Sequence, residues 1–179
     1  MNQSQVRTIL DFWFSKGWDD WWKPNPELDA EIRERFEALW EEQRENVPEH
    51  FLGSADEGLA AILLFDQFPR NMFRGHADQF STDPLALAIA KGAIARGHDD
   101  GMTPERRGFL YMPFEHSENL RDQVQSLLLF TALGSAEHLR YARLHHDVIK
   151  RFGRFPHRNA ILGRKPTALE EAAGEVVPW

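Results

Sequence analysis

Helix start signals recur along almost the whole of this chain. A capping side chain followed directly by proline is a typical helix start, and three such pairs occur: Asn25–Pro26, Asp83–Pro84 and Thr103–Pro104. A capping box, in which Ser or Thr precedes Glu by three residues, occurs twice: Ser54–Glu57 and Thr167–Glu170. Because apolar residues also recur at helical spacing nearly everywhere, most of the chain is predicted to be helical.

The second half of the chain repeats these signals around an apolar segment. Ser117 is expected to cap a helix whose apolar residues recur at Leu120, Val124, Leu127 and Leu128. Gly134 is expected to end this helix, and Ser135 to cap the next one. No stretch of the chain shows the sustained alternation of apolar and polar residues that is typical of strands.

We therefore predict an all-α fold with about seven or eight helices. The short connection Leu133–Gly134–Ser135 favours antiparallel neighbours, so the helices are expected to form a compact bundle or a stack of helical hairpins. No linker divides the chain, and residues 1–179 are expected to form a single domain. The glycine- and aspartate-rich residues 97–101 are expected to form a loop.

Proline and glycine place several polar side chains near predicted helix ends. Pro69 disfavours continuation of a helix, so the helix from Asp56 is expected to finish near Gln67. Gly153 is expected to take the left-handed position after another helix, and Pro113 to break a third. The polar residues expected just beyond helix C-termini are Arg70, Asn71, Arg74, His157, Arg158 and Asn159.

Composition excludes several classes of function. The chain has 42% hydrophobic and 27% charged residues, which is ordinary for a soluble globular protein. It has no Cys, which excludes a disulfide framework, a thiolate nucleophile and Cys-ligated zinc, and suits a reducing cytosol. The formal net charge of -7 argues against nucleic-acid binding. Without a secretory signal or an apolar run of about 20 residues, no membrane contact and a cytoplasmic location are expected.

Four unusual segments carry a resemblance to a known family. They read LLFDQFPRNMFRG, TDPLALAIA, ERRGFLYMPFEHSENLRDQ and RFGRFPHRNAILGR, and the N-terminal ILDFWF precedes them in the same order. Together they resemble the bacterial family catalogued as domain of unknown function 924, from about Ile9 to Glu171. The resemblance implies an all-helical, tetratricopeptide-like fold, a right-handed superhelix of hairpins stacked around a concave face. It implies no activity, because the family has no established catalytic or binding residues.

The segment RFGRFPHRNAILGR holds four arginines and a histidine and no acid. In a functional interpretation, Arg158 and Arg164 hold a carboxylate or phosphate, and His157 supplies a proton or hydrogen bond near neutral pH. Asn159 adds one donor and one acceptor group. In a structural interpretation, the same side chains bond the free carbonyls of neighbouring helix ends. Arg164 lies beyond an apolar turn and is expected to matter less in either role.

The segment FDQFPRNMFRG is a looser echo of the first. In the structural interpretation, which we favour here, Asp66 pairs with Arg70 across one helical turn. In the functional interpretation, Arg70, Asn71 and Arg74 line the same cavity as His157. The similarity of the two Phe-Pro segments suggests that they face each other.

The segment FEHSE offers a possible acid–base pair. His116 could act as a general base with Glu118 orienting it. Ser117 is better explained as a helix cap, and Glu118 also suits the first turn of a helix. His116 is therefore the residue whose role stays open.

No metal or cofactor is expected. The chain has no Gly-x-Ser-x-Gly elbow, no glycine-rich phosphate loop and no His-Glu-x-x-His spacing. A metal site would require His116, His157 and a carboxylate to converge in the fold, which we regard as the weaker alternative.

These observations predict a polar, net-basic pocket that receives an anionic small molecule or a peptide carboxylate. The residues expected to hold the ligand are Asp66, Arg70, Asn71, Arg74, Arg158 and Asn159. If the protein is an enzyme, the residues expected to act in catalysis are His116, His157 and Glu118, in acid–base or hydrolytic chemistry. The alternative is a non-catalytic scaffold that binds a partner protein and whose Phe-Pro segments only lock the fold.

Overall fold

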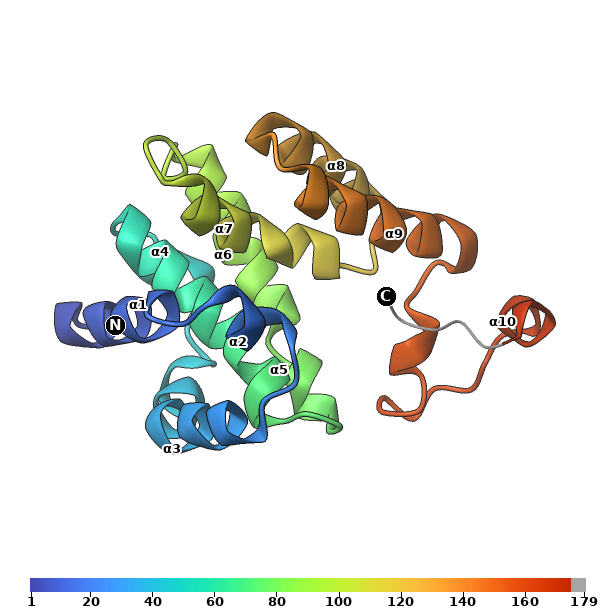
Figure 1. Cartoon of the computed structure of the whole chain (residues 1–179), viewed down its shortest axis with the longest axis horizontal. Coiled ribbons are helices and arrows are strands. Elements are labelled where there is room, and N and C mark those ends of the chain that lie inside the picture. Colours follow the sequence, from blue (N-terminus) through green and yellow to red (C-terminus); the bar gives the residue numbers. More distant parts are fainter. Residues whose placement is uncertain (175–179) are drawn as a thin grey trace. The chain divides into compact units, whose positions relative to one another are not determined.

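The computed structural model describes residues 1–174, which form helices joined by turns and contain no strand (Figure 1). The chain divides into two compact units, Met1–Pro113 and Phe114–Trp179. The α-helices are α1 (Gln3–Phe14), α2 (Trp18–Trp22), α3 (Pro26–Gln43), α4 (Ala55–Ile62), α5 (Phe68–Met72), α6 (Asp83–Ala95), α7 (Pro104–His116), α8 (Leu120–Leu133), α9 (Ala136–Phe152) and α10 (Ala168–Ala173). Shorter elements are the 3₁₀ turns η1 (Pro48–Phe51), η3 (Ala77–Phe80) and η4 (Pro156–Arg158), and the π-helical turn η2 (Leu63–Gln67).

This architecture confirms the all-α prediction. Within the described residues, α2, α5 and α10 are only five or six residues long, and the other α-helices have eight or more. The superhelical stacking of hairpins stays a prediction, and so does the folding of both units as one domain.

Most predicted helix starts and ends lie where the sequence places them. The capping side chain accepts a hydrogen bond from a backbone N–H of the first turn at Asn25, Ser54, Thr103, Ser135 and Thr167. Gly134 and Gly153 follow α8 and α9 with positive φ angles of 76° and 73°. These signals are reliable because each depends on a hydrogen bond within one helical turn.

Two predicted starts are displaced. The cap of α8 is Asn119, whose side chain accepts a hydrogen bond from the Arg121 N–H. Ser117 instead donates to the Asp122 carboxylate over 2.8 Å and accepts from the Asn119 N–H. Asp83 is already the first residue of α6, and its carboxylate accepts two hydrogen bonds from Arg70.

Pro69 does not end its helix, which corrects the prediction. The chain runs from α4 through the π-helical turn into α5, where Pro69 lies in the first turn. Pro69 has no N–H to donate to the Phe65 carbonyl four residues earlier. The Thr82 hydroxyl takes its place and donates to that carbonyl over 2.6 Å. Consequently Arg70 lies inside α5, together with Asn71, rather than beyond a helix end.

Pro113 likewise lies inside α7, although the sequence predicts a break there. Only one turn of helix follows, so its missing N–H removes a single intrahelical bond near the C-terminus. The boundary between the two units falls directly after Pro113, within this continuous helix.

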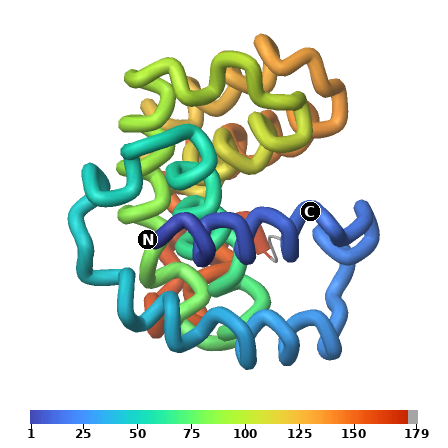
Figure 2. The backbone as a smooth tube through the Cα atoms, turned by 90° about the vertical axis from the view of Figure 1, so that its left-hand side faces the viewer, coloured from blue at the N-terminus to red at the C-terminus, as the bar shows by residue number. Residues whose placement is uncertain are grey.

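The core of the first unit is aromatic. Phe68 packs its ring 4.6 Å from Phe36 and 5.6 Å from Trp13, centroid to centroid, and all three side chains are at most 2% exposed. Helix α1 packs on α4, α3 on α5 and α4 on α6. Figure 2 follows this unit from α1, in dark blue, through α3 near the lower edge of the view to α4.

In the second unit, α8 and α9 form a hairpin through the turn at Gly134. The face that α8 buries differs from its most apolar one, because Gln123 and Ser126 are buried while Val124 and Leu128 are 46% and 60% exposed. No helix in the described part of the chain is long and apolar enough to cross a membrane.

Candidate functional site

The acid-free segment of the second unit is neutralised by glutamates from elsewhere. Glu118, in the turn before α8, accepts two hydrogen bonds from Arg164 over 2.6 and 3.0 Å and one from the Phe155 N–H over 2.7 Å. Burial alone would raise the pKa of this carboxyl, but the Arg164 and Phe155 hydrogen bonds outweigh burial and lower the pKa. Glu118 therefore binds the arginine segment.

Arg164 is central to this arrangement, although the sequence predicted that it would matter less. Besides Glu118, its guanidinium donates to the Asn159 side-chain oxygen and to the Phe155 carbonyl, each over 3.0 Å. All three guanidinium nitrogens of Arg164 therefore donate hydrogen bonds to groups of the same chain. The short loop after α9 brings the Phe155 and Asn159 groups to one side chain, which their sequence spacing could not show.

A second glutamate, Glu170 of α10, holds the other end of the segment. Arg154 donates to both of its carboxylate oxygens over 2.9 Å. Asn159 and the Thr167 N–H also donate to this carboxylate. The Arg154 hydrogen bonds are the main reason that the pKa of Glu170 falls to about 2. Sequence reasoning assigned Glu170 only to a capping box. A capping-box carboxylate has a second oxygen that can accept from another donor, and this property could have suggested a further partner.

His145 and His157 pack against the Phe155 ring, and His116 packs against His145. The His145 ring lies 5.5 Å from Phe155 and 6.2 Å from the His116 ring, and His157 lies 5.5 Å from Phe155. The Arg158 guanidinium covers the same aromatic ring at 4.5 Å and donates to the His116 carbonyl over 3.1 Å. Arg158 is buried, with 7% of its surface exposed.

The acid–base pair in this cluster is His145 with Glu115, which sequence reasoning missed. His145 Nδ1 lies 2.9 Å from a Glu115 carboxylate oxygen and 2.9 Å from the Tyr141 carbonyl oxygen. Because both partners are acceptors, Nδ1 carries the proton, and Nε2 is the acceptor when the ring is neutral. Burial, and then the charge of Arg158, lower the pKa of His157 to about 4, so His157 is neutral near pH 7.

The predicted ligand-binding residues of the first unit bond to aspartates. Arg70 donates to both Asp83 carboxylate oxygens over 2.8 and 3.0 Å and to the Asp66 carbonyl over 2.5 Å. Burial opposes the Arg70 charge, but Asp66 and Asp83 together raise the pKa of Arg70. The Asp66 carboxylate lies 3.4 Å from Arg70 and also accepts from the Gln67 amide.

Asp29 of α3 collects the remaining two residues of this segment. Asn71 donates to it over 2.7 Å, and Arg74 donates through two nitrogens over 2.8 and 2.9 Å. The two Phe-Pro segments lie in different units, so a shared pocket stays a prediction. In residues 1–174, no three His, Asp or Glu side chains gather in a way that could hold a metal ion.

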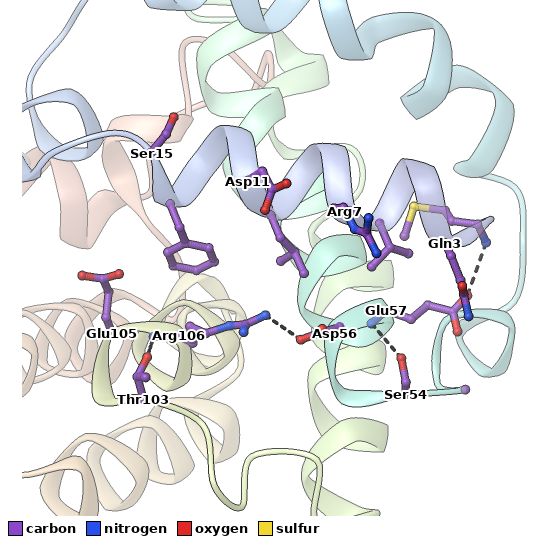
Figure 3. Close-up of a pocket in the computed structure, with 15 residues that line it drawn as sticks. Gln3, Arg7, Asp11, Ser15, Ser54, Asp56, Glu57, Thr103, Glu105 and Arg106 are labelled. Carbon is purple, nitrogen blue, oxygen red and sulfur yellow. Dashed lines mark hydrogen bonds and ion pairs between the residues drawn. The ribbon is translucent and has the colours of Figure 1, made fainter.

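A groove of about 960 Å³ lies in the first unit, where the sequence suggested no site (Figure 3). We call it the α1 groove, because α1 forms one wall and the starts of α4 and α7 form the other. It is lined by Met1, Gln3, Val6, Arg7, Leu10, Asp11, Phe14, Ser15, Gly53, Ser54, Asp56, Glu57, Thr103, Glu105 and Arg106. Sequence reasoning treated Ser54, Glu57 and Thr103 as helix-start residues and predicted no site at these positions.

Residues 9–173 match the family described as bacterial protein of unknown function (DUF924). This chain belongs to the DUF924 family. Among solved structures, it is similar to a protein of unknown function from Agrobacterium tumefaciens, with 40% sequence identity and a TM-score of 0.87. The likeness covers 95% of this chain and 96% of the Agrobacterium chain. No curated protein matches the sequence. The family resemblance stated from the motifs is thereby confirmed.

Proposed function

We propose that this DUF924 protein is a non-catalytic helical scaffold that binds a partner protein, with the Phe-Pro segments locking its helix ends. One observation carries the proposal: the side chains first predicted to hold a ligand already bond to their own chain. The pairs are Arg70 with Asp83, Arg74 and Asn71 with Asp29, Asn159 with Glu170, and Arg158 with the His116 carbonyl. Arg154 likewise donates to Glu170, and Arg164 donates to Glu118.

An incoming anion would have to compete with these carboxylates. Arg154, Arg164 and Arg74 each hold a carboxylate through two nitrogens, which is the strongest geometry for such a pair. Releasing one of them would leave a buried or half-buried acid without its hydrogen bonds, at a cost of about 1–3 kcal/mol or more. The network therefore serves stability better than ligand capture. A chain without cysteine suits the reducing cytosol, where we propose that the scaffold works.

Thermal melts of arginine variants test this proposal. We expect Arg164→Ala to lose about 1–3 kcal/mol, and therefore several degrees of melting temperature. Arg154→Ala should also lower the melting temperature, because it leaves the Glu170 carboxylate without its two hydrogen bonds from Arg154. Arg143→Ala is the matched control, because Arg143 is an exposed residue of α9 without an ion pair among the described residues. Phosphate, sulfate, citrate and acetate should leave the wild-type melting temperature unchanged.

The anionic ligand remains the second candidate, favoured by the histidine cluster. Glu115 orients His145 in the way that carboxylates orient catalytic histidines. His116 packs against His145, and His157 packs against the Phe155 ring that His145 also contacts. In this second candidate function, Arg158 holds an anionic small molecule or a peptide carboxylate. It replaces our first proposal if one of the four anions raises the wild-type melting temperature and fails to do so in Arg158→Ala.

A further inference from the structure

We infer that the α1 groove binds a short basic peptide segment of the partner protein in an extended conformation. The inference rests on the scaffold function proposed above and names the surface and the partner's chemistry. Three properties of the groove support the inference. They are a row of apolar side chains, the spacing of that row, and rim carboxylates that no ion pair neutralises among the described residues.

The wall that α1 forms carries a row of apolar side chains. Val6, Leu10 and Phe14 follow each other at intervals of four residues and therefore lie on one face of the helix. Leu10 is buried, while Val6 and Phe14 are partly exposed. Val6 and Phe14 therefore offer apolar surface to a partner on either side of the buried Leu10.

The spacing of this row suits an extended chain. Four residues of α-helix rise about 6 Å, and alternate side chains of a β-strand are about 6.6 Å apart. A segment of about five residues can therefore place its first and fifth side chains on Val6 and Phe14, with the third between them above the buried Leu10. Its other side chains then point towards the polar rim.

The rim has a surplus of negative charge. Arg106 pairs with Asp56 over 2.6 Å, and the Met1 amine pairs with Glu57 over 3.4 Å, so these charges cancel. Two exposed acids, Asp11 of α1 and Glu105 of α7, have no ion pair among the described residues (Figure 3).

One rim cation, Arg7, is also without an ion pair in the described part of the chain. The two unpaired acids outnumber it, and the whole chain has a formal net charge of -7. A basic segment is therefore complementary to the groove and is attracted by the protein as a whole. An acidic segment would meet two like charges and one opposite charge.

Three labelled hexapeptides test the inference by fluorescence anisotropy. The first alternates leucine and lysine, the second leucine and glutamate, and the third serine and lysine, all with blocked termini. We expect the leucine–lysine peptide to bind full-length protein at low salt, at least about tenfold more tightly than either of the others, which is a difference of about 1.4 kcal/mol. Binding of the leucine–glutamate peptide with equal affinity would overturn the inference.

Matched protein variants locate the binding site. The double variant Asp11→Asn, Glu105→Gln should bind the leucine–lysine peptide about tenfold more weakly, and its melting temperature should stay within about 2 °C of wild type, because both residues are exposed. Val6→Thr keeps the side-chain shape and should also weaken binding. Glu49→Gln removes an exposed acid of η1 outside the groove and should have no effect.

Failure of this inference can be told apart from failure of the scaffold proposal. If no peptide binds, or if the double variant and Val6→Thr bind as wild type does, the α1 groove is not the binding site. The scaffold proposal is judged separately, by the melts of the arginine variants and the four anions.

Discussion

The His157 side chain is neutral at pH 7 because burial disfavours its charged form and because protonation would place a second positive charge beside Arg158. Burial is the largest cause of its lowered pKa, followed by Arg158 and His145, and Glu118 opposes the change only in part. In the unfolded chain the imidazole has an ordinary pKa of about 6.5, against about 4 in the folded protein. The unfolded state therefore binds more protons between these values, so stability is highest above pH 6.5 and falls as the pH drops towards 4.

This shift predicts that the stability falls in acid and that His157→Gln reduces this fall. Between pH 7.5 and pH 5.0 the shift alone would cost the wild type about 2 kcal/mol. Because His157 is partly exposed, solvent screening reduces the expected loss to about 1 kcal/mol. Urea unfolding of both proteins at the two pH values measures it. The variant should keep a smaller change in the free energy of unfolding with pH, because burial also lowers the pKa of His138. An equal change in wild type and variant would contradict the prediction.

The helix that contains Pro69 shows how a residue from another element can decide where a helix ends. Proline would leave the Phe65 carbonyl without a donor in a buried position. The Thr82 hydroxyl donates to that carbonyl and accepts from the Trp40 indole N–H over 3.1 Å. One side chain between η3 and α6 thus satisfies two buried groups, and α5 can continue from the π-helical turn.

Replacing Thr82 should therefore destabilise the first unit strongly. Thr82→Val keeps the shape of the side chain but leaves the Phe65 carbonyl and the Trp40 N–H unpaired, at about 1–3 kcal/mol for each group. Thr82→Ser keeps the hydroxyl and should cost much less. The control is Thr8→Val on the exposed face of α1, and thermal melts compare the three variants. Equal stability of Thr82→Val and Thr8→Val would show that the Thr82 hydroxyl does not support the helix.

The two compact units share a helix, and this bears on how the protein unfolds. Helix α7 runs without interruption from Pro104 to His116, across the boundary after Pro113. Neither unit keeps all of its helical hydrogen bonds if the other one unfolds. We therefore expect one cooperative transition, as the single-domain prediction requires.

Scanning calorimetry checks this expectation. The calorimetric and van 't Hoff enthalpies should agree for the full chain. Gly substitution at the exposed Glu105, in the first turn of α7, should lower the temperature of the single transition without splitting it. Two resolved transitions would mean that Met1–Pro113 and Phe114–Trp179 unfold independently.

The amino-acid sequence was sufficient for the helices and many of their ends. Asn25, Ser54, Ser135 and Thr167 cap helices as predicted, because the cap and its partner N–H lie within three residues of each other. The motifs were also sufficient to recognise the DUF924 family, since their order and composition are properties of the chain alone.

The partners of the arginines required the folded chain. Arg164 and Glu118 are 46 residues apart, and Arg74 and Asp29 are 45 apart. Nothing in the local pattern distinguishes an arginine that meets a distant acid on its own chain from one that awaits a ligand. The continuation of the helix past Pro69 and the α1 groove have the same origin. Each depends on which segments folding brings together, and packing free energy summed over distant residues decides that.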